Sequence, residues 1–445
     1  MAYIEPFSGI MFDPARAGAL SDLLCPPYDI ISGPEQERLH RIHPHNIVHL
    51  ELGIEEPGDA PGSDRYSRAG ALWEDWLSQG VLTQDRQPAL YVYEQRWADR
   101  KRMAFFAAVR LAPWHSGEVL PHELTLSGPK KDRLELMRHT GANLSPVMGL
   151  YDDAEGTVQT ILAEAIAAPP VVQASLGDET HKVWRLTAWD AIAAIQESLA
   201  GRPIFIADGH HRYETALTYR DERRQAQGAY SGEEPWNYVL MALCALSDPG
   251  LVVLPTHRLV RAPDLDRRAF LERLGRSFRI EAASLGNAAP DPRSQSGALL
   301  SQLTGKHRLA MVFGGDLAPH ILELATSPEL ALTHLPQSKP WRELAVAHLH
   351  YLILADVLGI PESEWKGGQH IVYTRDSAEV VSRVGSGEFD IGFLLEAPPV
   401  DQITRVALAG DVMPQKSTYF YPKLPTGLVV HRLDEHPAST GAPSP

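Results

Sequence analysis

The feature that most constrains the fold is a short apolar segment that runs directly into a turn of charged and polar residues. Pro203–Ala207 (PIFIA) reads as a short strand, and Asp208-Gly209-His210-His211-Arg212 follows it at once. Gly209 has no β-carbon and therefore permits a tight turn. A helical pattern follows from about Tyr213 to Gln225. The sequence therefore predicts a strand, a tight turn and a helix at this point.

The residue types in the turn suit an anionic ligand such as a nucleotide phosphate. The first turn of a helix has unsatisfied backbone N–H groups and a positive dipole end, so it attracts anions. We assign Gly209 and Arg212 to cofactor binding, because the planar donors of arginine fit phosphate oxygens. Asp208 is a candidate ligand for Mg²⁺ and a candidate base, and His210 and His211 are further catalytic candidates.

Simpler interpretations of the same turn stay open. Asp208 also fits a helix cap, and either histidine also fits a packed or solvated position. A zinc site is disfavoured, because adjacent histidines normally point two ways, unlike the i, i+4 pair of a helical zinc site.

Helical and strand patterns alternate along the rest of the chain, which indicates the α/β class and leaves α+β open. Residues 283–298 have the composition of a linker. We therefore expect an N-terminal and central domain over 1–282 and a C-terminal α/β domain over 299–433. Residues 434–445 have no apolar content worth burying, which predicts a disordered tail.

Near the N-terminus, the segment Asn46–Leu52 (NIVHLEL) is predicted to form a strand.

A second group of chemically active types lies between His122 and Arg133. Glu123 is our first candidate for the base that deprotonates a substrate hydroxyl. Lys131 and Arg133 are candidates for neutralising phosphate charge. The alternative is a solvated charged loop.

Two further polar segments complete the candidate site. His257 and Arg258 follow the apolar run Leu251–Leu254, and strand ends are favoured places for sites in α/β folds. Lys416, Ser417 and Thr418 lie between Pro414 and the aromatic segment Tyr419–Tyr421, where they suit a loop that binds phosphate. The alternatives are a structural polar turn and an aromatic edge strand.

Charge and composition narrow the class of protein. The 445 residues carry 41 Lys+Arg against 56 Asp+Glu, and this net charge of −15 argues against a protein that coats DNA. The two cysteines exclude a disulfide scaffold and an all-cysteine zinc site. Neither a signal peptide nor an apolar run near ~18 residues is visible, so we expect a cytoplasmic protein without a membrane partner.

The turn at Asp208 resembles the ParB/sulfiredoxin-like nucleotide-binding superfamily, whose hallmark is a Gly-x-x-Arg loop that opens a helix. Here that pattern is Gly209-His210-His211-Arg212. The whole chain resembles the bacterial and archaeal domain-of-unknown-function family numbered one thousand and fifteen. The matching segments are Pro27–Ser32, His122–Thr125, Asp208–Leu217, Leu254–Arg258 and Met413–Lys423.

This resemblance implies a ParB/sulfiredoxin-like core that binds ATP or ADP with Mg²⁺. Sulfiredoxin chemistry is in doubt, because histidine stands where the sulfiredoxin loop has its catalytic cysteine. Some free-serine kinases carry a similar loop. Our first hypothesis is therefore a phosphotransferase acting on a small hydroxylated metabolite such as serine. A non-catalytic nucleotide-binding regulator and a phosphoester hydrolase are the alternatives, and the oligomeric state, homo-oligomer included, stays open.

Overall fold

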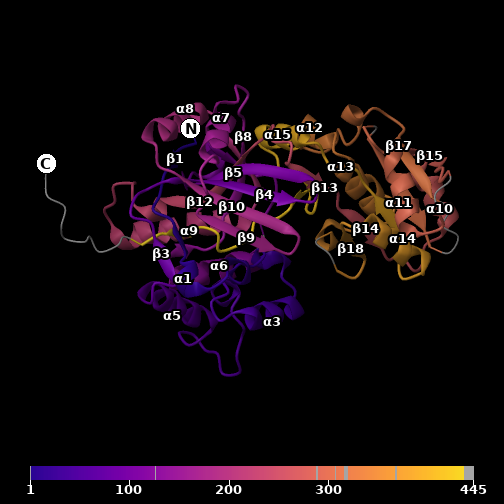
Figure 1. The fold of residues 1–445 in the computed structure, drawn as a ribbon. Helices are drawn as coiled ribbons and strands as arrows, with labels where there is room; N and C mark the ends of the chain where they lie inside the picture. The colour runs from indigo at the N-terminus through magenta and orange to yellow at the C-terminus, as the bar shows by residue number, and fades with distance from the viewer. Residues whose placement is uncertain are drawn as a thin grey trace, which may run out of the picture. The chain divides into compact units, whose positions relative to one another are not determined.

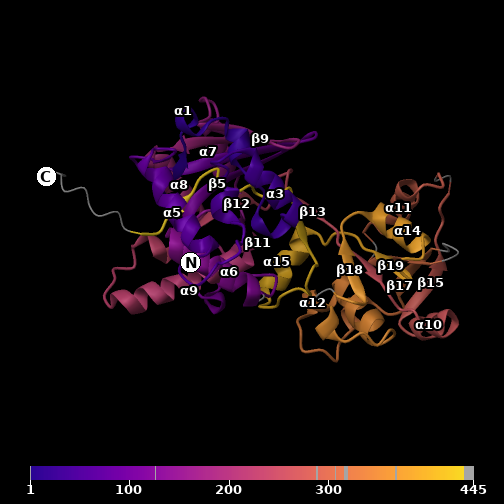
Figure 2. The ribbon, with the colours of Figure 1, turned by 90° about the horizontal axis from the view of Figure 1, so that it is seen from below.

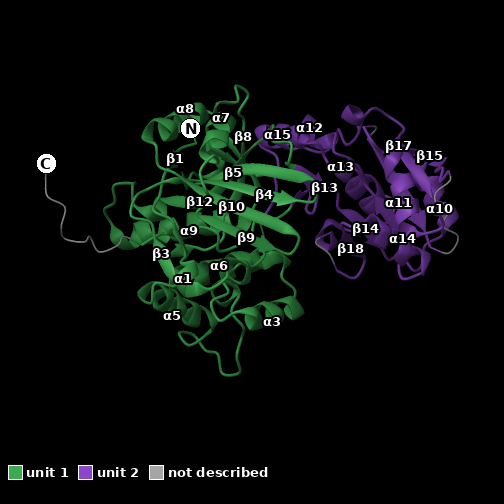
Figure 3. Ribbon diagram, in the orientation of Figure 1, with its two compact units in different colours: residues 1–121, 125–251, 422–445 green, residues 122–124, 252–421 purple. Residues whose placement is uncertain are grey.

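The computed structural model describes residues 2–125, 127–286, 289–305, 307–314, 319–365 and 368–434. The chain forms two compact units, shown in different colours in Figure 3. Unit 1 comprises Met1–Pro121, Thr125–Leu251 and Pro422–Pro445, and unit 2 comprises His122–Leu124 and Val252–Tyr421. The domain boundary that we placed in 283–298 stays a prediction. The disordered tail that we expect over 434–445 lies outside the described residues, apart from Asp434.

Unit 1 is built on a large mixed sheet whose strand order is β6-β11-β8-β12-β5-β4-β10-β9, with β1 paired to β5. Its strands are β1 Ile4–Glu5, β4 Leu90–Trp97, β5 Arg100–Arg110, β6 Val119–Leu120, β8 Val147–Tyr151, β9 Val172–Leu176, β10 Glu179–Leu186, β11 Ile204–Asp208 and β12 Tyr238–Ala245. Most neighbours are antiparallel, whereas β11 with β6 and β12 with β8 are parallel. Helices therefore accompany a sheet of both pairing types, and the α/β class is confirmed.

Helices lie on both sides of this sheet. In Figures 1 and 2, α7 and α8 lie on one side and α9 on the other. The helices of unit 1 are α1 Pro14–Ala17, α2 Leu20–Leu23, α3 Gly33–Ile42, α4 Val48–Glu51, α5 Arg65–Ser78, α6 Ser127–Thr140, α7 Thr157–Ala165, α8 Trp189–Leu199 and α9 His210–Gln227. Two small ribbons add β2 Ile10–Phe12 with β3 Leu82–Gln84, and β7 Ala142–Asn143 with β21 His431–Arg432.

One local expectation in unit 1 is wrong. Asn46–Leu52 was expected to form a strand, but its centre is the short helix α4. Val48 and Leu50 both pack into one apolar cluster with Trp73 and Trp76 of α5. A short apolar run fits a strand or a buried helix equally well, and here packing against α5 decides.

Unit 2 contains an antiparallel sheet with the strand order β15-β17-β16-β19-β14-β18. Its strands are β14 His257–Val260, β15 Phe278–Ala282, β16 Arg308–Phe313, β17 His320–Leu324, β18 Ile371–Thr374 and β19 Ile391–Leu394, and β13 Val252–Leu254 pairs separately with β20 Tyr419–Tyr421. Its helices include α10 Arg267–Leu274, α11 Pro292–Ser301, α12 Lys339–Arg342, α13 Ala345–His348, α14 Ser377–Gly385 and α15 Val400–Leu408.

The core of unit 2 lies between this sheet and helices α11 and α14. Val380 and Val384 of α14 and Leu299 of α11 pack against Leu259 and Val312 of the sheet. After α13 the chain continues as a π-helix, η5 Leu349–Ala355, in which His350 is buried. Such wide turns often mark functional positions, and this one places His350 beside Arg258 of β14.

Candidate functional site

The predicted strand, turn and helix are present at Asp208. Strand β11 is buried over Ile204–Ala207 and ends at Asp208, and Gly209 then adopts a φ of 91°, which favours glycine. Helix α9 begins at His210 and runs for 18 residues. Its first-turn N–H groups and its positive dipole end therefore lie directly after the strand.

Arg212 does not extend from this helix but folds back over the turn. Its Nη2 donates to Asp208 Oδ2 at 2.6 Å, and its Nη1 donates to the carbonyl oxygen of Pro146. A β-carbon at Gly209 would lie 2.9 Å from Arg212 Nε. Gly209 is therefore required both by its φ and by the guanidinium that packs against it.

A lysine far away in the sequence completes the cluster. Lys423 Nζ donates to Asp208 Oδ1, so the two carboxylate oxygens pair with two different cations. The backbone of this segment is fixed by the large sheet, because the carbonyl oxygen of Pro422 accepts from buried Arg102 at 2.7 Å and that of Lys423 accepts from Gln95 at 3.3 Å. We name Asp208, Arg212 and Lys423 the Asp208 cluster.

The electrostatics of the Asp208 cluster favour charged forms. Burial raises the pKa of Asp208, but Lys423 and Arg212 outweigh burial and hold the pKa well below its usual range. The three side chains are only 10–14% exposed, so water screens them little. A carboxyl group that is ionised this firmly is a poor proton acceptor near pH 7. Asp208 is therefore suited to holding Arg212 and Lys423 in place.

The two histidines occupy different environments at the start of α9. His210 is buried, and His211 is half-buried. Burial lowers the pKa of His211, although Asp29 and Glu214 oppose this effect. His211 is consequently neutral near pH 7, the form in which an imidazole accepts a proton.

Lys131 and Arg133 both lie on α6, but their surroundings differ. Lys131 is exposed. Arg133 is buried, lies 3.2 Å from Glu51 Oε1, bonds to Asp132 and stacks over the ring of Tyr28 at 4.0 Å. The donors of Arg133 are therefore engaged by groups within the protein interior. It shares with Arg212 and Glu51 a small cavity of about 30 Å³, which has room for about one water molecule.

In unit 2, the segment around Glu123 joins the loop that carries Thr418. His122 Nε2 lies 2.8 Å from Thr418 Oγ1, and the carbonyl oxygen of His122 accepts from the backbone N–H of Met413 at 2.8 Å. Glu123 is half-buried next to these bonds. The two segments that we selected separately from the sequence therefore meet.

Arg258 ties the same loop to β14. Its Nη2 donates to the carbonyl oxygen of Lys416 at 3.1 Å and lies 3.3 Å from His350 Nε2. Lys416 has a φ of 57°, an uncommon value for a residue with a side chain, and its side chain is exposed. Ser417 is buried and donates to the carbonyl oxygen of Pro414.

His257 lies in the interior of unit 2. It has no exposed surface, and its Nδ1 accepts from the backbone N–H of Leu395 at 3.2 Å. Burial lowers the pKa of His257 to about 4, so the ring is neutral and fits this acceptor role. Its direct contact with a nucleotide, which we expected from the sequence, stays a prediction.

The residues predicted from the sequence thus form two groups. Unit 1 brings together Asp208, Gly209, His210, His211 and Arg212, with Lys131 and Arg133 on α6. Unit 2 brings together Glu123, His257, Arg258, Lys416, Ser417 and Thr418. One site made from both groups stays a prediction.

Sequence reasoning included Lys423 in the segment Met413–Lys423 but did not pair it with Asp208, and it did not find His350 or Glu51. Lys423 follows the aromatic segment Tyr419–Tyr421, and nothing in its neighbourhood indicates a partner at Asp208. His350 lies in an apolar helical pattern and carried no signal.

The structure does not support a resident metal at Asp208. Over the described ranges, no group of three or more His, Cys, Asp or Glu side chains could hold a metal ion. Both oxygens of Asp208 already pair with cations.

Of the helices formed by the described residues, none is both long and apolar enough to cross a membrane.

Comparison with known proteins gives one extended match. A family model described as "Protein of unknown function (DUF1015)" matches residues 4–346. No curated protein matches the chain. Among solved structures, a free serine kinase in complex with AMP is similar at 14% identity and a TM-score of 0.34, covering 73% of this chain and 92% of that chain.

Two other solved structures are similar to the same degree. A conserved hypothetical protein from Pyrococcus furiosus has 14% identity and a TM-score of 0.32, with 73% of this chain and 95% of that chain covered. SbnI with a C-terminal truncation, from Staphylococcus aureus, has 9% identity and a TM-score of 0.34, and the match covers 72% of this chain and 85% of that chain.

Proposed function

The chain belongs to the DUF1015 family, whose description assigns no activity, and we propose from its own residues that it is a nucleotide-dependent phosphotransferase. The acceptor in this proposal is a small hydroxylated metabolite such as serine. Gly209-x-x-Arg212 serves as a loop of the ParB/sulfiredoxin-like type that holds the phosphates of ATP or ADP.

The observation that carries the proposal is the charge balance of the Asp208 cluster. Two cations, Arg212 and Lys423, share one carboxylate at the start of an 18-residue helix. Within these three side chains the positive charges outnumber the negative one, and they lie where the helix dipole also favours an anion. Phosphate oxygens that approach the turn replace Asp208 as partners of these cations, and the arginine fork suits them.

The neighbouring cations of unit 1 are less available to a ligand. Arg133 pairs with Glu51 and Asp132, and Lys130 Nζ lies 2.7 Å from Glu214 Oε1. Burial lowers the pKa of Arg212, and the charges of Asp208 and then Asp29 raise it. Asp29 is exposed, so water screens its charge. The surplus positive charge is thus concentrated at Arg212 and Lys423, with exposed Lys131 as a second contact.

In this proposal, residues other than Asp208 accept the proton of the acceptor hydroxyl. Glu123 is the first candidate for the base, and His211, which is neutral near pH 7, is the second, with His210 beside it. Mg²⁺ belongs to this proposal as the ion that accompanies the nucleotide, since Mg²⁺ is commonly held by substrate phosphates with one or two carboxylates. Arg258, Lys416, Ser417 and Thr418 stay candidates for stabilising phosphoryl charge.

Binding and turnover test the two halves of the proposal separately. Calorimetry with ADP and ATP should detect binding to the full-length protein, and Arg212→Met should weaken it at least tenfold. Arg223→Met is the matched control, because Arg223 lies on the same helix and is 43% exposed. Failure of both nucleotides to bind would refute the nucleotide site.

Phosphate transfer to a panel of hydroxylated metabolites, followed by phosphorus NMR, tests catalysis. Glu123→Gln should abolish transfer and leave nucleotide binding intact. Tight binding without transfer to any acceptor would overturn the kinase proposal and favour a nucleotide-binding regulator. Release of inorganic phosphate from phosphoesters, without transfer, would favour a hydrolase.

A further inference from the structure

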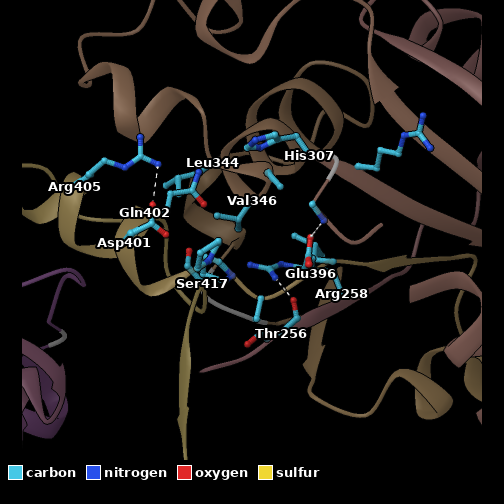
Figure 4. A pocket seen from close by; sticks show the side chains of 17 residues that line it. Thr256, Arg258, His307, Leu344, Val346, Glu396, Asp401, Gln402, Arg405 and Ser417 are labelled. Atoms are coloured by element: carbon cyan, nitrogen blue, oxygen red, sulfur yellow. Dashed lines mark hydrogen bonds and ion pairs between the residues drawn. The ribbon is translucent and has the colours of Figure 1, made fainter. Parts of the chain in front are cut away.

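Unit 2 contains a cavity of about 280 Å³ that is lined by its own residues. Its apolar wall is formed by Leu344, Val346 and Leu395, together with small and proline side chains. Arg258, Ser417 and Thr256 also line it, and Figure 4 shows these side chains around the cavity. A volume below the range typical of drug-sized pockets fits a small metabolite.

Arg258 is an unusual side chain for such a wall. It is 1% exposed, and among the residues that the structure describes no carboxylate forms an ion pair with it. Its hydrogen-bond partners are two backbone carbonyl oxygens, of Thr256 and Lys416, and the ring of His350, all of them uncharged, and its Nε has no hydrogen-bond partner. A buried charge without a counter-charge is costly, so this position favours a ligand that supplies one.

The other charged side chains around the cavity are already compensated or exposed. Arg308 donates to Glu323 at 2.7 Å, and Arg405 lies 3.6 Å from both Glu343 and Asp401. Glu396 accepts from the backbone N–H of Gly305 and is exposed to water. Among the described residues that line the cavity, Arg258 is therefore the buried cation that lacks a counter-charge.

We propose that this cavity binds a small monocarboxylic acid, with its carboxylate on Arg258 and its carbon skeleton against Leu344, Val346 and Leu395. One arginine fork matches the two oxygens and the single negative charge of a carboxylate. A phosphate carries more charge than Arg258 alone compensates, and it offers nothing to the apolar wall. The proposal does not depend on nucleotide binding at the Asp208 cluster.

Three probes of matched design test the ligand class. Butyrate has a carboxylate and a short apolar body, butylammonium has the same body with the opposite charge, and inorganic phosphate has an anionic head without a body. Butyrate should raise the melting temperature of the full-length protein and bind in calorimetry. Butylammonium should do neither, and phosphate should bind at least tenfold more weakly than butyrate. Equal or tighter binding of phosphate would overturn the proposal.

Two variants locate the binding in this cavity. Arg258→Met should weaken butyrate binding at least tenfold, and Arg261→Met, which removes a half-exposed arginine nearby in the sequence, should leave it unchanged. Because a buried substitution can impair folding, Ala397→Leu supplies a second test: it adds volume at a residue that lines the cavity, keeps Arg258 in place, and should also abolish binding. Butyrate binding that survives both Arg258→Met and Ala397→Leu would refute the site.

ADP binding, measured on the same samples, separates this proposal from the nucleotide proposal. Ala397→Leu should retain ADP binding while losing butyrate, because Ala397 lines the cavity and has no part in the nucleotide proposal. Butyrate binding without ADP binding would refute the nucleotide site alone, and ADP binding without butyrate binding would refute the carboxylate site alone.

Discussion

The guanidinium of Arg212 packs against Gly209, so that a β-carbon on Gly209 would lie 2.9 Å from Arg212 Nε and 3.0 Å from Cζ. The glycine of the turn and the arginine one helical turn later therefore form one unit. The empty space above the glycine lets the arginine fold back, and the folded-back arginine reaches Asp208. The Gly-x-x-Arg spacing thus places a cation directly at the start of α9.

Gly209→Ala should weaken nucleotide binding at least tenfold, because the new methyl group displaces Arg212 and is strained at a φ of 91°. Gly228→Ala is the matched control. Gly228 ends the same helix at a φ of 73°, but a β-carbon there meets nothing within 4 Å. Calorimetry with ADP compares the two variants. Equal loss of affinity in both would mean that backbone strain alone, and not the position of Arg212, controls binding.

Lys423→Met should destabilise the protein by about 3 kcal/mol at pH 7, since it breaks a largely buried ion pair with Asp208. The folded-state pKa of Asp208 lies below the unfolded value, so the carboxylate stabilises the fold above about pH 4. This contribution is lost as the pH falls through the folded-state pKa. The difference in unfolding free energy between wild type and Lys423→Met should therefore shrink between about pH 5 and pH 2.

Urea unfolding at several pH values measures this difference. Lys339→Met is the control, because Lys339 forms its ion pair with Glu329 on the exposed surface. A difference for Lys423→Met that stays constant down to pH 2 would contradict the pairing with Asp208.

Gly392→Ala should destabilise unit 2 by about 2 kcal/mol through overpacking. A β-carbon on Gly392 of β19 would lie 2.4 Å from Val380 Cγ1 of α14, and a β-branched side chain has little freedom to move away. Gly297→Ala in helix α11 should instead stabilise unit 2 by about 0.5–1 kcal/mol. A β-carbon there meets no atom within 4 Å, and alanine favours helices more than glycine does. Urea unfolding of both variants should show opposite signs.

Both cysteines should resist thiol reagents in the native protein. Cys25 and Cys244 are fully buried free thiols, and burial raises the pKa of each well above its ordinary value. Ellman's reagent at pH 8 should therefore detect no thiol before denaturation and two afterwards. Rapid reaction of either thiol in the folded protein would show that the surrounding packing opens readily.

The turn at Asp208 could be predicted from the sequence because everything that specifies it is local. Buried Ile204–Ala207 marks a strand, the next residues are Asp208 and Gly209, and the helical pattern begins immediately. The same local reasoning failed at α4, where a short apolar run packs as a helix against α5.

The partners of these residues could not be predicted, because they are set by tertiary structure. Lys423 is 215 positions from Asp208, and Arg258 is 158 positions from Lys416. No charge pattern near either end indicates the pairing. The burial of Arg258 without a counter-charge was equally invisible, since an isolated arginine after a strand reads as a polar turn. What the sequence provides is the set of chemical groups, and the fold decides which of them face one another.

The most direct test of the central claim is calorimetric titration of the full-length protein with ADP, with wild type and Arg212→Met compared side by side. The account predicts saturable binding to wild type and at least tenfold weaker binding to Arg212→Met, with Arg223→Met unchanged. Binding of the same affinity in all three proteins would contradict the assignment of nucleotide phosphates to the Gly209–Arg212 turn.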